Sequence, residues 1–177
     1  MTNKVETVVR KLLREAAVHE PPVDVETLAR SQGVAVTYQP LPAGADDLSG
    51  CFVHTPDGRY IIGVNAAHHP NRQRFTVAHE LGHFLLHQDS VDDVHVDGVF
   101  LRDQRSAAVV EPIEIEANAF AASLLMPEAM LKKDLARLEG LDDEEQVRAL
   151  ARRYAVSVQA MTLRLVNLGV FRVESHE

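Results

Sequence analysis

Two histidines and a glutamate stand close together in the stretch AHELGHFLLH, residues 78–87. His79 and His83 are four residues apart. On a helix this spacing places them about 40° apart in azimuth and about 6 Å apart along the axis, so both imidazoles lean toward one point. Two neutral imidazoles in this relation match two corners of a tetrahedral zinc site. The spacing therefore predicts a metal site on a helix.

Glu80 follows His79 directly, which places it about 100° farther around the helix. From there it need not bind the metal, and it can reach a water beside the metal as a general base. HExxH on a helix is the recognised form of this arrangement. Random placement also produces the motif, so a second observation matters. Gly82 costs about 1 kcal/mol against alanine in a helix interior, which is easiest to understand if another element packs closely there.

A catalytic zinc needs a third protein ligand and an open position. In the pattern HExxHxxGxxH, Leu86 stands where the glycine belongs and Asp89 where the last histidine belongs. Without the glycine, the chain has no evident way to turn back to the metal, which disfavours Asp89. His87 lies about 12 Å along the axis from His79, too far to share one metal with it, and is expected to form a hydrogen bond at the helix end.

A carboxylate from a second helix is the favoured third ligand. The stretch EPIEIEANAF offers Glu111, Glu114 and Glu116. Glu116 shares a helix face with Phe120, four residues on. A glutamate on that buried face is costly unless it meets a cation. Glu116 is therefore the expected ligand, and Glu114 is expected to point outward.

The elements that must position these groups indicate an α+β fold, mainly helical, with a small antiparallel β-sheet. Asp24 is expected to cap a short helix that stops at Gly33. Two β-rich runs around Thr-Pro-Asp-Gly predict a hairpin, and VHV-DG-VFL predicts a second, smaller one. Helices are expected at 3–18, 70–87, 111–125 and 127–138, followed by two short helices around a turn at 156–157.

The last segment, LARRYAVSVQAMTLRL, has the rhythm of a helix-turn-helix. Its arginines could contact phosphate groups; they are Arg148, Arg152, Arg153 and Arg164. Against this, DDEE immediately precedes the segment and the chain carries a net charge of −8. We therefore favour a helical pair that packs on the core or docks the substrate over one that binds DNA.

Composition excludes several further classes of protein. The net charge of −8 and pI of about 5.6 disfavour a general nucleic-acid-binding protein. The single Cys51 excludes an internal disulfide and a zinc site of several cysteines, and a small buried side chain is its expected role. The N-terminal segment has no apolar run typical of a signal peptide, and no stretch is long enough to span a bilayer. A cytoplasmic protein is expected.

Two paired segments, RFTVAHELGHFLLH and EIEANAFAASLLMP, resemble the ImmA/IrrE-type metallopeptidases, and the likeness extends over roughly residues 5–170. The resemblance implies a zincin-like domain over 1–140, with residues 141–177 as a small helical extension packed on it. It also implies that His79, His83 and Glu116 bind Zn²⁺ and that Glu80 is the catalytic base. Such enzymes cleave helix-turn-helix repressors, which this chain would meet in trans.

The sequence therefore predicts a zinc endopeptidase that cleaves a transcriptional repressor and so releases mobile-element or stress-response genes. Two histidines and a glutamate would also accept Mn²⁺ or Fe²⁺. Tyr60, His54 and Tyr154 are candidates for a second electrophile. Two alternatives stay open, namely a module that sequesters its repressor without cutting it and a DNA-binding regulator acting through the last helices. The presence of Glu80 disfavours the first alternative, and the net negative charge of the chain disfavours the second.

Overall fold

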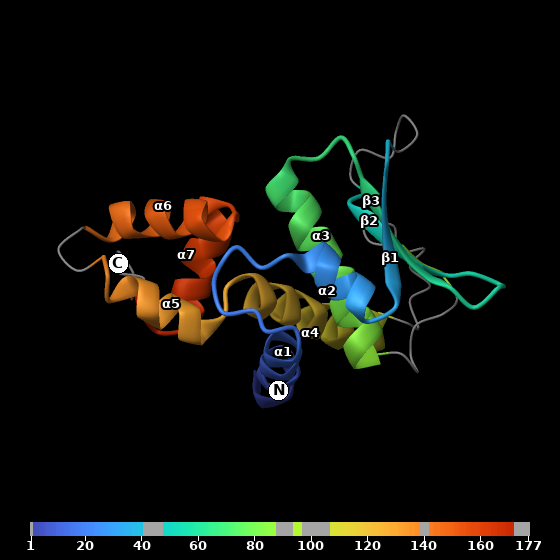
Figure 1. Cartoon of the computed structure of the whole chain (residues 1–177), viewed down its shortest axis with the longest axis horizontal. Coiled ribbons are helices and arrows are strands. Elements are labelled where there is room, and N and C mark those ends of the chain that lie inside the picture. The colour runs from blue at the N-terminus through green and yellow to red at the C-terminus, as the bar shows by residue number, and fades with distance from the viewer. Residues whose placement is uncertain (1, 41–47, 88–93, 97–106, 139–141, 172–177) are drawn as a thin grey trace.

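Helices surround a long helical pair that joins a small β-sheet at one end to a cluster of short helices at the other (Figure 1). The computed structural model describes residues 2–40, 48–87, 94–96, 107–138 and 142–171. The described elements are α1 (Thr2–Glu15), α2 (Val25–Ser31), β1 (Val34–Gln39), β2 (Gly50–His54), β3 (Tyr60–Asn65), α3 (Pro70–His87), β4 (Val94–Val96), α4 (Ala107–Leu125), α5 (Glu128–Leu135), α6 (Asp143–Tyr154) and α7 (Val158–Asn167). The predicted α+β class is confirmed.

The sheet has the strand order β1–β3–β2–β4 and is mixed. Strand β2 is antiparallel to β3 and β4, whereas β1 runs parallel to β3, with Val34 opposite Tyr60. The prediction of a purely antiparallel sheet is therefore wrong at β1. Strand β1 therefore runs in the same direction as β3 and in the opposite direction to β2.

The first predicted hairpin is confirmed. Strands β2 and β3 are joined by a tight turn in which the Gly58 N–H donates to the Thr55 carbonyl at 2.8 Å. Gly58 adopts a φ of +82°, the left-handed conformation that glycine enters without a steric penalty. Of the second predicted hairpin, the first strand is β4, which pairs with β2. Residues 97–101 lie outside the described part of the chain.

One face of the sheet is covered by helices. Phe52 on β2 and Ile62 and Val64 on β3 are buried, in the core that α3 shares. The prediction of a capped short helix is confirmed in α2, since Asp24 accepts a hydrogen bond from the Thr27 N–H at 3.1 Å and Gly33 follows with a φ of +81°. Helix α2 packs against β1 and α3. The sheet and α2 thus hold the outer side of α3 in place.

Helices α3 and α4 form the centre of the molecule (Figure 1). They approach closely at Gly82, where an added Cβ atom would meet Phe120 at 3.0–3.2 Å. Phe120 is fully buried. Close packing of α4 therefore explains the glycine inside α3, as its position in the sequence suggested.

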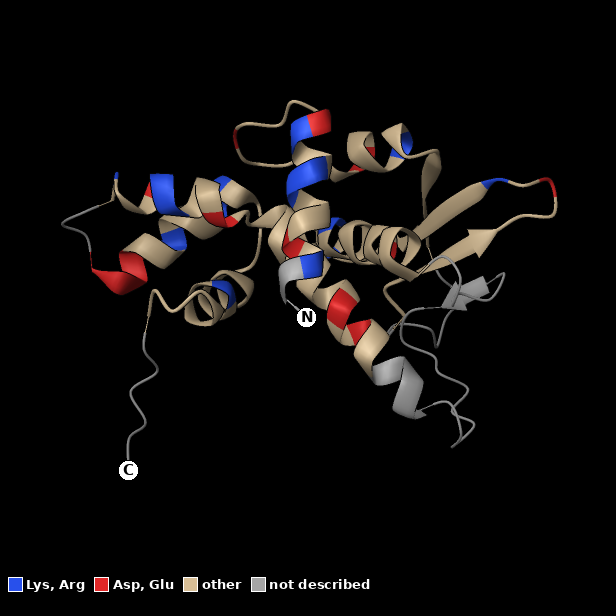
Figure 2. Ribbon diagram, turned by 90° about the horizontal axis from the view of Figure 1, so that it is seen from below, with Lys and Arg blue, Asp and Glu red and all other residues tan. Residues whose placement is uncertain are grey.

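The last three helices are separated from the central pair by the Met126-Pro127 break. Asp142 caps α6 and Ser157 caps α7, each accepting a hydrogen bond from a backbone N–H three residues on. The two predicted short helices are confirmed, with Ala155 in the left-handed conformation between them. Acidic residues crowd the first turn of α6 and basic residues follow along it (Figure 2).

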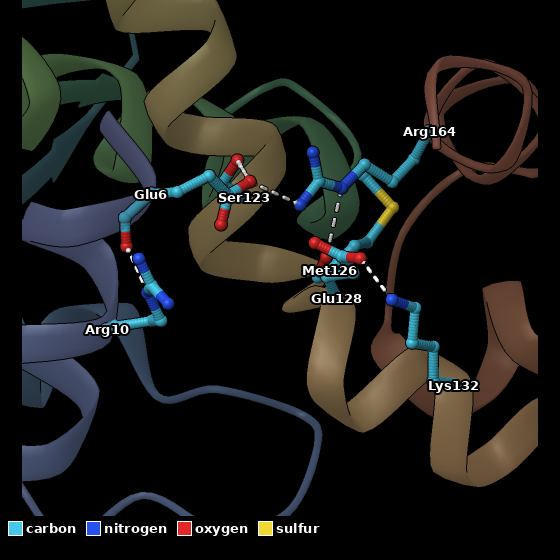
Figure 3. Close-up of polar contacts among 7 residues, drawn as sticks. All are labelled: Glu6, Arg10, Ser123, Met126, Glu128, Lys132 and Arg164. Carbon is cyan, nitrogen blue, oxygen red and sulfur yellow. Dashed lines mark hydrogen bonds and ion pairs between the residues drawn. The ribbon is translucent and has the colours of Figure 1, made fainter. Parts of the chain in front are cut away.

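A buried arginine connects α7 to the rest of the fold (Figure 3). Arg164 is 8% exposed, and its guanidinium lies 2.9 Å from a Glu6 carboxylate oxygen on α1 and donates to the Met126 carbonyl at 3.1 Å. Ser123 on α4 donates to the same Glu6 carboxylate at 2.7 Å. Arg164 is therefore occupied in linking three helices and is not available for phosphate contacts.

A second buried group, Asp134 on α5, anchors α6. It accepts hydrogen bonds from the Tyr154 hydroxyl at 2.9 Å and from Arg153 at 2.8 Å, and Arg137 lies 3.1 Å away. Burial raises the pKa of the Asp134 carboxyl, but these donors outweigh it and hold that pKa below the usual range. These contacts of Asp134 thus hold α6 against α5. The division of the chain at residue 140 stays a prediction.

Among the helices that the structure describes, none has the length and apolar character needed to cross a bilayer.

Removing the Arg164 side chain should destabilise the fold strongly, because it leaves the Glu6 carboxylate, only 19% exposed, without its cation. We expect Arg164→Ala to lower the free energy of unfolding by about 3 kcal/mol, measured by urea denaturation. Lys11→Ala, at the exposed Lys11–Glu15 pair, is the control and should cost less than about 0.5 kcal/mol. Equal losses for the two variants would contradict the role given to Arg164.

Candidate metal centre

Helix α3 brings the two histidines of HExxH together as their spacing predicts. His79 and His83 are 4% and 0% exposed. Their Nε2 atoms lie 3.0 Å apart, and the ring planes are inclined at 75°. The two imidazoles therefore point their Nε2 atoms at one buried place on the side of α3 that faces α4.

Helix α4 contributes a carboxylate to the same place. One oxygen of Glu114 lies 3.3 Å from Nε2 of His79 and the other lies 3.1 Å from Nε2 of His83. Together the three side chains offer ligand atoms that all lie within 4.8 Å of one another. Among the described residues, this is the one group of three or more such side chains able to hold a metal ion.

The carboxylate that reaches the imidazoles is Glu114, and the expectation that Glu116 would reach them is corrected. Glu116 lies against His87 instead, with its Oε2 atom 3.4 Å from Nε2 of His87. Both glutamate side chains are about equally accessible, at 20% and 19%. Glu114 therefore does not point outward as the sequence suggested.

The direction in which α4 crosses α3 explains the error. Phe120 does face α3, as predicted, and it packs at Gly82. One turn before Phe120, the same face of α4 carries Glu116, which lies beside His87. The imidazoles of His79 and His83 lie beside this line of contact, and the adjacent face of α4 carries Glu114. The sequence pattern gave the correct buried face but not which side of it the ligands would occupy.

Asn118, one turn after Glu114, holds the first imidazole in orientation. Its Oδ1 atom lies 3.1 Å from Nδ1 of His79. Because an amide oxygen only accepts, Nδ1 of His79 carries the proton, and Nε2 is left as a bare lone pair facing the centre. Partners of this kind fix the tautomer of metal-binding histidines. The sequence indicates this role of Asn118 through its four-residue spacing from Glu114, which places both side chains on one face of the helix.

The three groups fit a divalent cation. Electron-pair donors that converge at 3.0–3.3 Å repel one another unless positive charge lies between them. In a tetrahedral zinc site with bonds of about 2.0–2.1 Å, ligand atoms stand roughly 3.3 Å apart. Two imidazole nitrogens and a carboxylate also form the ligand set that zinc accepts. Both the spacing and the chemistry of these donors therefore agree with a metal of this kind.

Glu80 is fully buried and does not belong to this group of ligand atoms. Its carboxylate lies close enough to β2 to influence Cys51: burial raises the pKa of that thiol first, and the charge of Glu80 raises it further. Cys51 is half-buried, in keeping with its predicted role as a small packing side chain. Glu80 is therefore buried beside the two imidazoles without being one of the three ligand groups.

Of the three candidates for a second electrophile, one lies far from the centre and two lie near α3. Tyr154 is buried against Asp134 in the C-terminal helices, so it is no second electrophile for this centre. His54 and Tyr60 stack with ring centroids 4.5 Å apart, and Tyr60 also contacts Phe84 on α3 at 4.9 Å. They stay candidates. Asp89 lies outside the described residues.

Comparison with known proteins shows the family of this chain. The model of the peptidase family described as the IrrE N-terminal-like domain matches residues 29–166. The radiation response metalloprotease IrrE of Deinococcus radiodurans is 35% identical over 141 residues, which are 75% of this chain and 39% of that protein. The metallopeptidase ImmA of Bacillus subtilis is 28% identical over 121 residues, 67% of this chain and 64% of that protein.

A solved structure supports the fold. A Mycobacterium tuberculosis transcriptional regulator superposes with a TM-score of 0.64 at 20% identity, covering 92% of this chain and 46% of the regulator. The chain therefore spans less than two thirds of each of these three relatives.

Exchanging the two glutamates of α4 one at a time tests the ligand set. Glu114→Gln should weaken Zn²⁺ binding by more than the about 10–100-fold that loss of an outer partner costs, because it removes the only anionic ligand. Glu116→Gln, the matched control two residues away, should change the affinity by less than about tenfold. A competition titration with a chelating dye measures both. The reverse ranking would restore Glu116 as the ligand.

Gly82→Ala tests whether the close contact of α3 and α4 sets the centre. The new methyl group meets the Phe120 side chain at about 3.0 Å, so Phe120 must give way by a few tenths of an ångström, and we expect α4 to shift with it and carry Glu114 away from the imidazoles. We expect at least about tenfold weaker Zn²⁺ binding, with little change in the melting temperature of the metal-free chain, because the gain in helix propensity offsets the crowding. Phe120→Leu in the same chain should restore part of the affinity. Unchanged binding in Gly82→Ala would show that the contact does not control the centre.

Proposed function

Because this chain belongs to the peptidase family of the IrrE N-terminal-like domain, we propose that it is a metal-dependent endopeptidase with its centre at His79, His83 and Glu114. The observation that carries the proposal is the convergence of three electron-pair donors from two helices on one buried point. The names of the relatives, a metalloprotease and a metallopeptidase, support it.

We assign the metal as Zn²⁺ and give each side chain a role. A bound zinc ion supplies a Lewis acid that lowers the pKa of water toward neutrality and stabilises negative charge that develops on the scissile carbonyl. His79 and His83 would hold the ion through Nε2, and Glu114 would hold it through its carboxylate. Asn118 keeps His79 in the tautomer that leaves Nε2 bare.

Glu80 is assigned as the general base. It takes a proton from the attacking water and returns it to the leaving amine, so that neither hydroxide nor a free amide anion has to form. Its complete burial and its place next to His79 in HExxH support this role, since the carboxylate is kept apart from bulk solvent beside the centre. A centre with a purely structural metal would have no use for such a base.

The substrate class that we propose is a transcriptional repressor of the helix-turn-helix type. The support is the family likeness of the two motif segments. DNA binding by the last helices is disfavoured, because Arg164 and Arg153 are occupied by Glu6 and Asp134. Cleavage of such a repressor would release the mobile-element or stress-response genes that it holds silent.

Glu80→Gln tests the base. The variant keeps the size of the side chain but cannot accept the proton, so cleavage should fall by about 10²–10⁴-fold or more. Metal content and binding of the substrate should stay close to those of the unchanged chain, because the base acts mainly in the transition state. The measurement is incubation of both proteins with Zn²⁺ and a candidate helix-turn-helix repressor, following fragments and complex formation together.

Each departure from this result has its own meaning. Equal cleavage by the two proteins removes Glu80 from the chemistry. Binding by both without any cleavage supports the alternative of a module that sequesters its repressor. Loss of metal in the variant would make Glu80 a ligand or a structural group.

A further inference from the structure

We propose that the substrate polypeptide docks between the N-terminal half of α3 and α7, placing a large apolar side chain in a groove there and an acidic side chain against the arginines beyond it. This inference rests on the proposed peptidase function, because it states how the substrate of that same centre is held.

The groove has a volume of about 520 Å³. Its walls are mainly apolar and come from three helices that are distant in sequence: Phe75 of α3, Leu125 of α4, and Ala160 and Leu163 of α7. Val156, just before α7, completes one side. A hollow of this size and character suits one or two large aliphatic or aromatic side chains.

Both central helices lead from the metal centre into this groove. On α3, Phe75 lies one turn before His79 and stacks on it, with ring centroids 6.3 Å apart and planes inclined at 28°. On α4, Asn118 contacts His79, and Leu125 lines the groove about two turns farther on. The groove therefore begins within one to two helical turns of the metal centre along both helices.

The side of the groove formed by α7 leaves apolar surface in contact with water. Leu163 is 57% exposed and Val158, at the start of the same helix, is 49% exposed. Neither side chain is required by the internal packing of α7, which buries Met161 and Leu165 instead. Covering Leu163 with an apolar side chain of the substrate is favourable, because it removes this surface from water.

A second hollow, of about 450 Å³, continues the groove past Asn71 and Val156. Its walls include Arg148 and Arg152 of α6. Arg148 is paired with Glu144, whereas Arg152 is exposed and forms no ion pair with the described residues. In a chain of net charge −8, this local positive charge selects an acidic group on the bound polypeptide.

The helix geometry fixes the spacing of these two contacts. Phe75 lies about 6 Å and Asn71 about 12 Å from His79 along the axis of α3, at about 1.5 Å per residue. An extended substrate advances about 3.3 Å per residue. The apolar side chain therefore belongs about two residues from the scissile bond, and the acidic side chain about four.

A peptide selection tests the proposal without depending on cleavage. A pool of short random peptides is passed over immobilised, zinc-loaded Glu80→Gln chain, and the retained peptides are sequenced. We expect enrichment of Leu, Met or Phe with Asp or Glu about two residues beyond, by about tenfold over the input. Leu163→Lys should lose the apolar preference, and Arg152→Glu should lose the acidic preference and favour Lys or Arg.

Two matched controls lie outside the groove. Val170→Lys changes another exposed apolar residue, 40% exposed, and Arg14→Glu changes an exposed arginine of α1. Both should retain the peptides of the parent chain. The proposal is overturned if no motif is enriched, or if the groove variants select the same peptides as the controls.

Parallel measurements separate other occupants and separate this proposal from the peptidase function. Salt-sensitive binding of duplex DNA that Arg152→Glu removes and Leu163→Lys spares would assign the surface to nucleic acid. A dimer in sedimentation that Leu163→Lys dissociates would assign it to a second copy. Either result overturns the proposal. If the peptides are retained selectively but the unchanged chain does not cut them, the peptidase function is rejected and the docking site stands. If the chain cuts peptides without the predicted preferences, the docking site is rejected and the peptidase function stands.

Discussion

The approach of α4 to α3 at Gly82 is the contact on which the rest of the site depends. With no side chain at Gly82, the ring of Phe120 packs directly against the backbone of α3. That distance allows a short carboxylate on α4 to reach imidazoles on α3. A side chain at Gly82 would press on Phe120, at 3.0–3.2 Å from an added Cβ atom, and would push the two helices apart at the level of the three donors. The free-energy cost of glycine in a helix is therefore offset by the geometry that it permits.

Much of this arrangement could be predicted from the sequence because it depends on local spacing. The azimuths of His79, Glu80 and His83 follow from one helix, and the hairpin follows from its turn residues. The choice between Glu114 and Glu116 does not, because it depends on the angle at which two helix axes cross, and no pattern within either helix contains that angle. The parallel pairing of β1 with β3 is likewise a tertiary feature. It joins segments that are distant in the chain, so no local pattern indicates it.

The C-terminal helices show how charge in a sequence can mislead. Arg148, Arg152, Arg153 and Arg164 read together as a cationic surface. In the fold Arg164 and Arg153 turn toward Glu6 and Asp134, so their charges serve attachment to the core. The exposed Arg152, beside an apolar groove, remains for recognition. The structure thus separates four arginines that lie close together in the sequence: Arg164 and Arg153 pair with carboxylates of other helices, Arg148 pairs with Glu144 in its own helix, and Arg152 forms no ion pair with the described residues.

The division of the proposed metal ligands between α3 and α4 would link occupancy of the centre to the integrity of the core. A cation held jointly by the two helices binds the folded chain and not the unfolded one. It therefore adds about 2.7 kcal/mol of stability when its free concentration is a hundred times the dissociation constant. Metal starvation would remove that increment from the packing of Phe120 on Gly82, and the chain would be degraded faster as well as left inactive. The supply of metal would then govern how much of this protein persists in the cell.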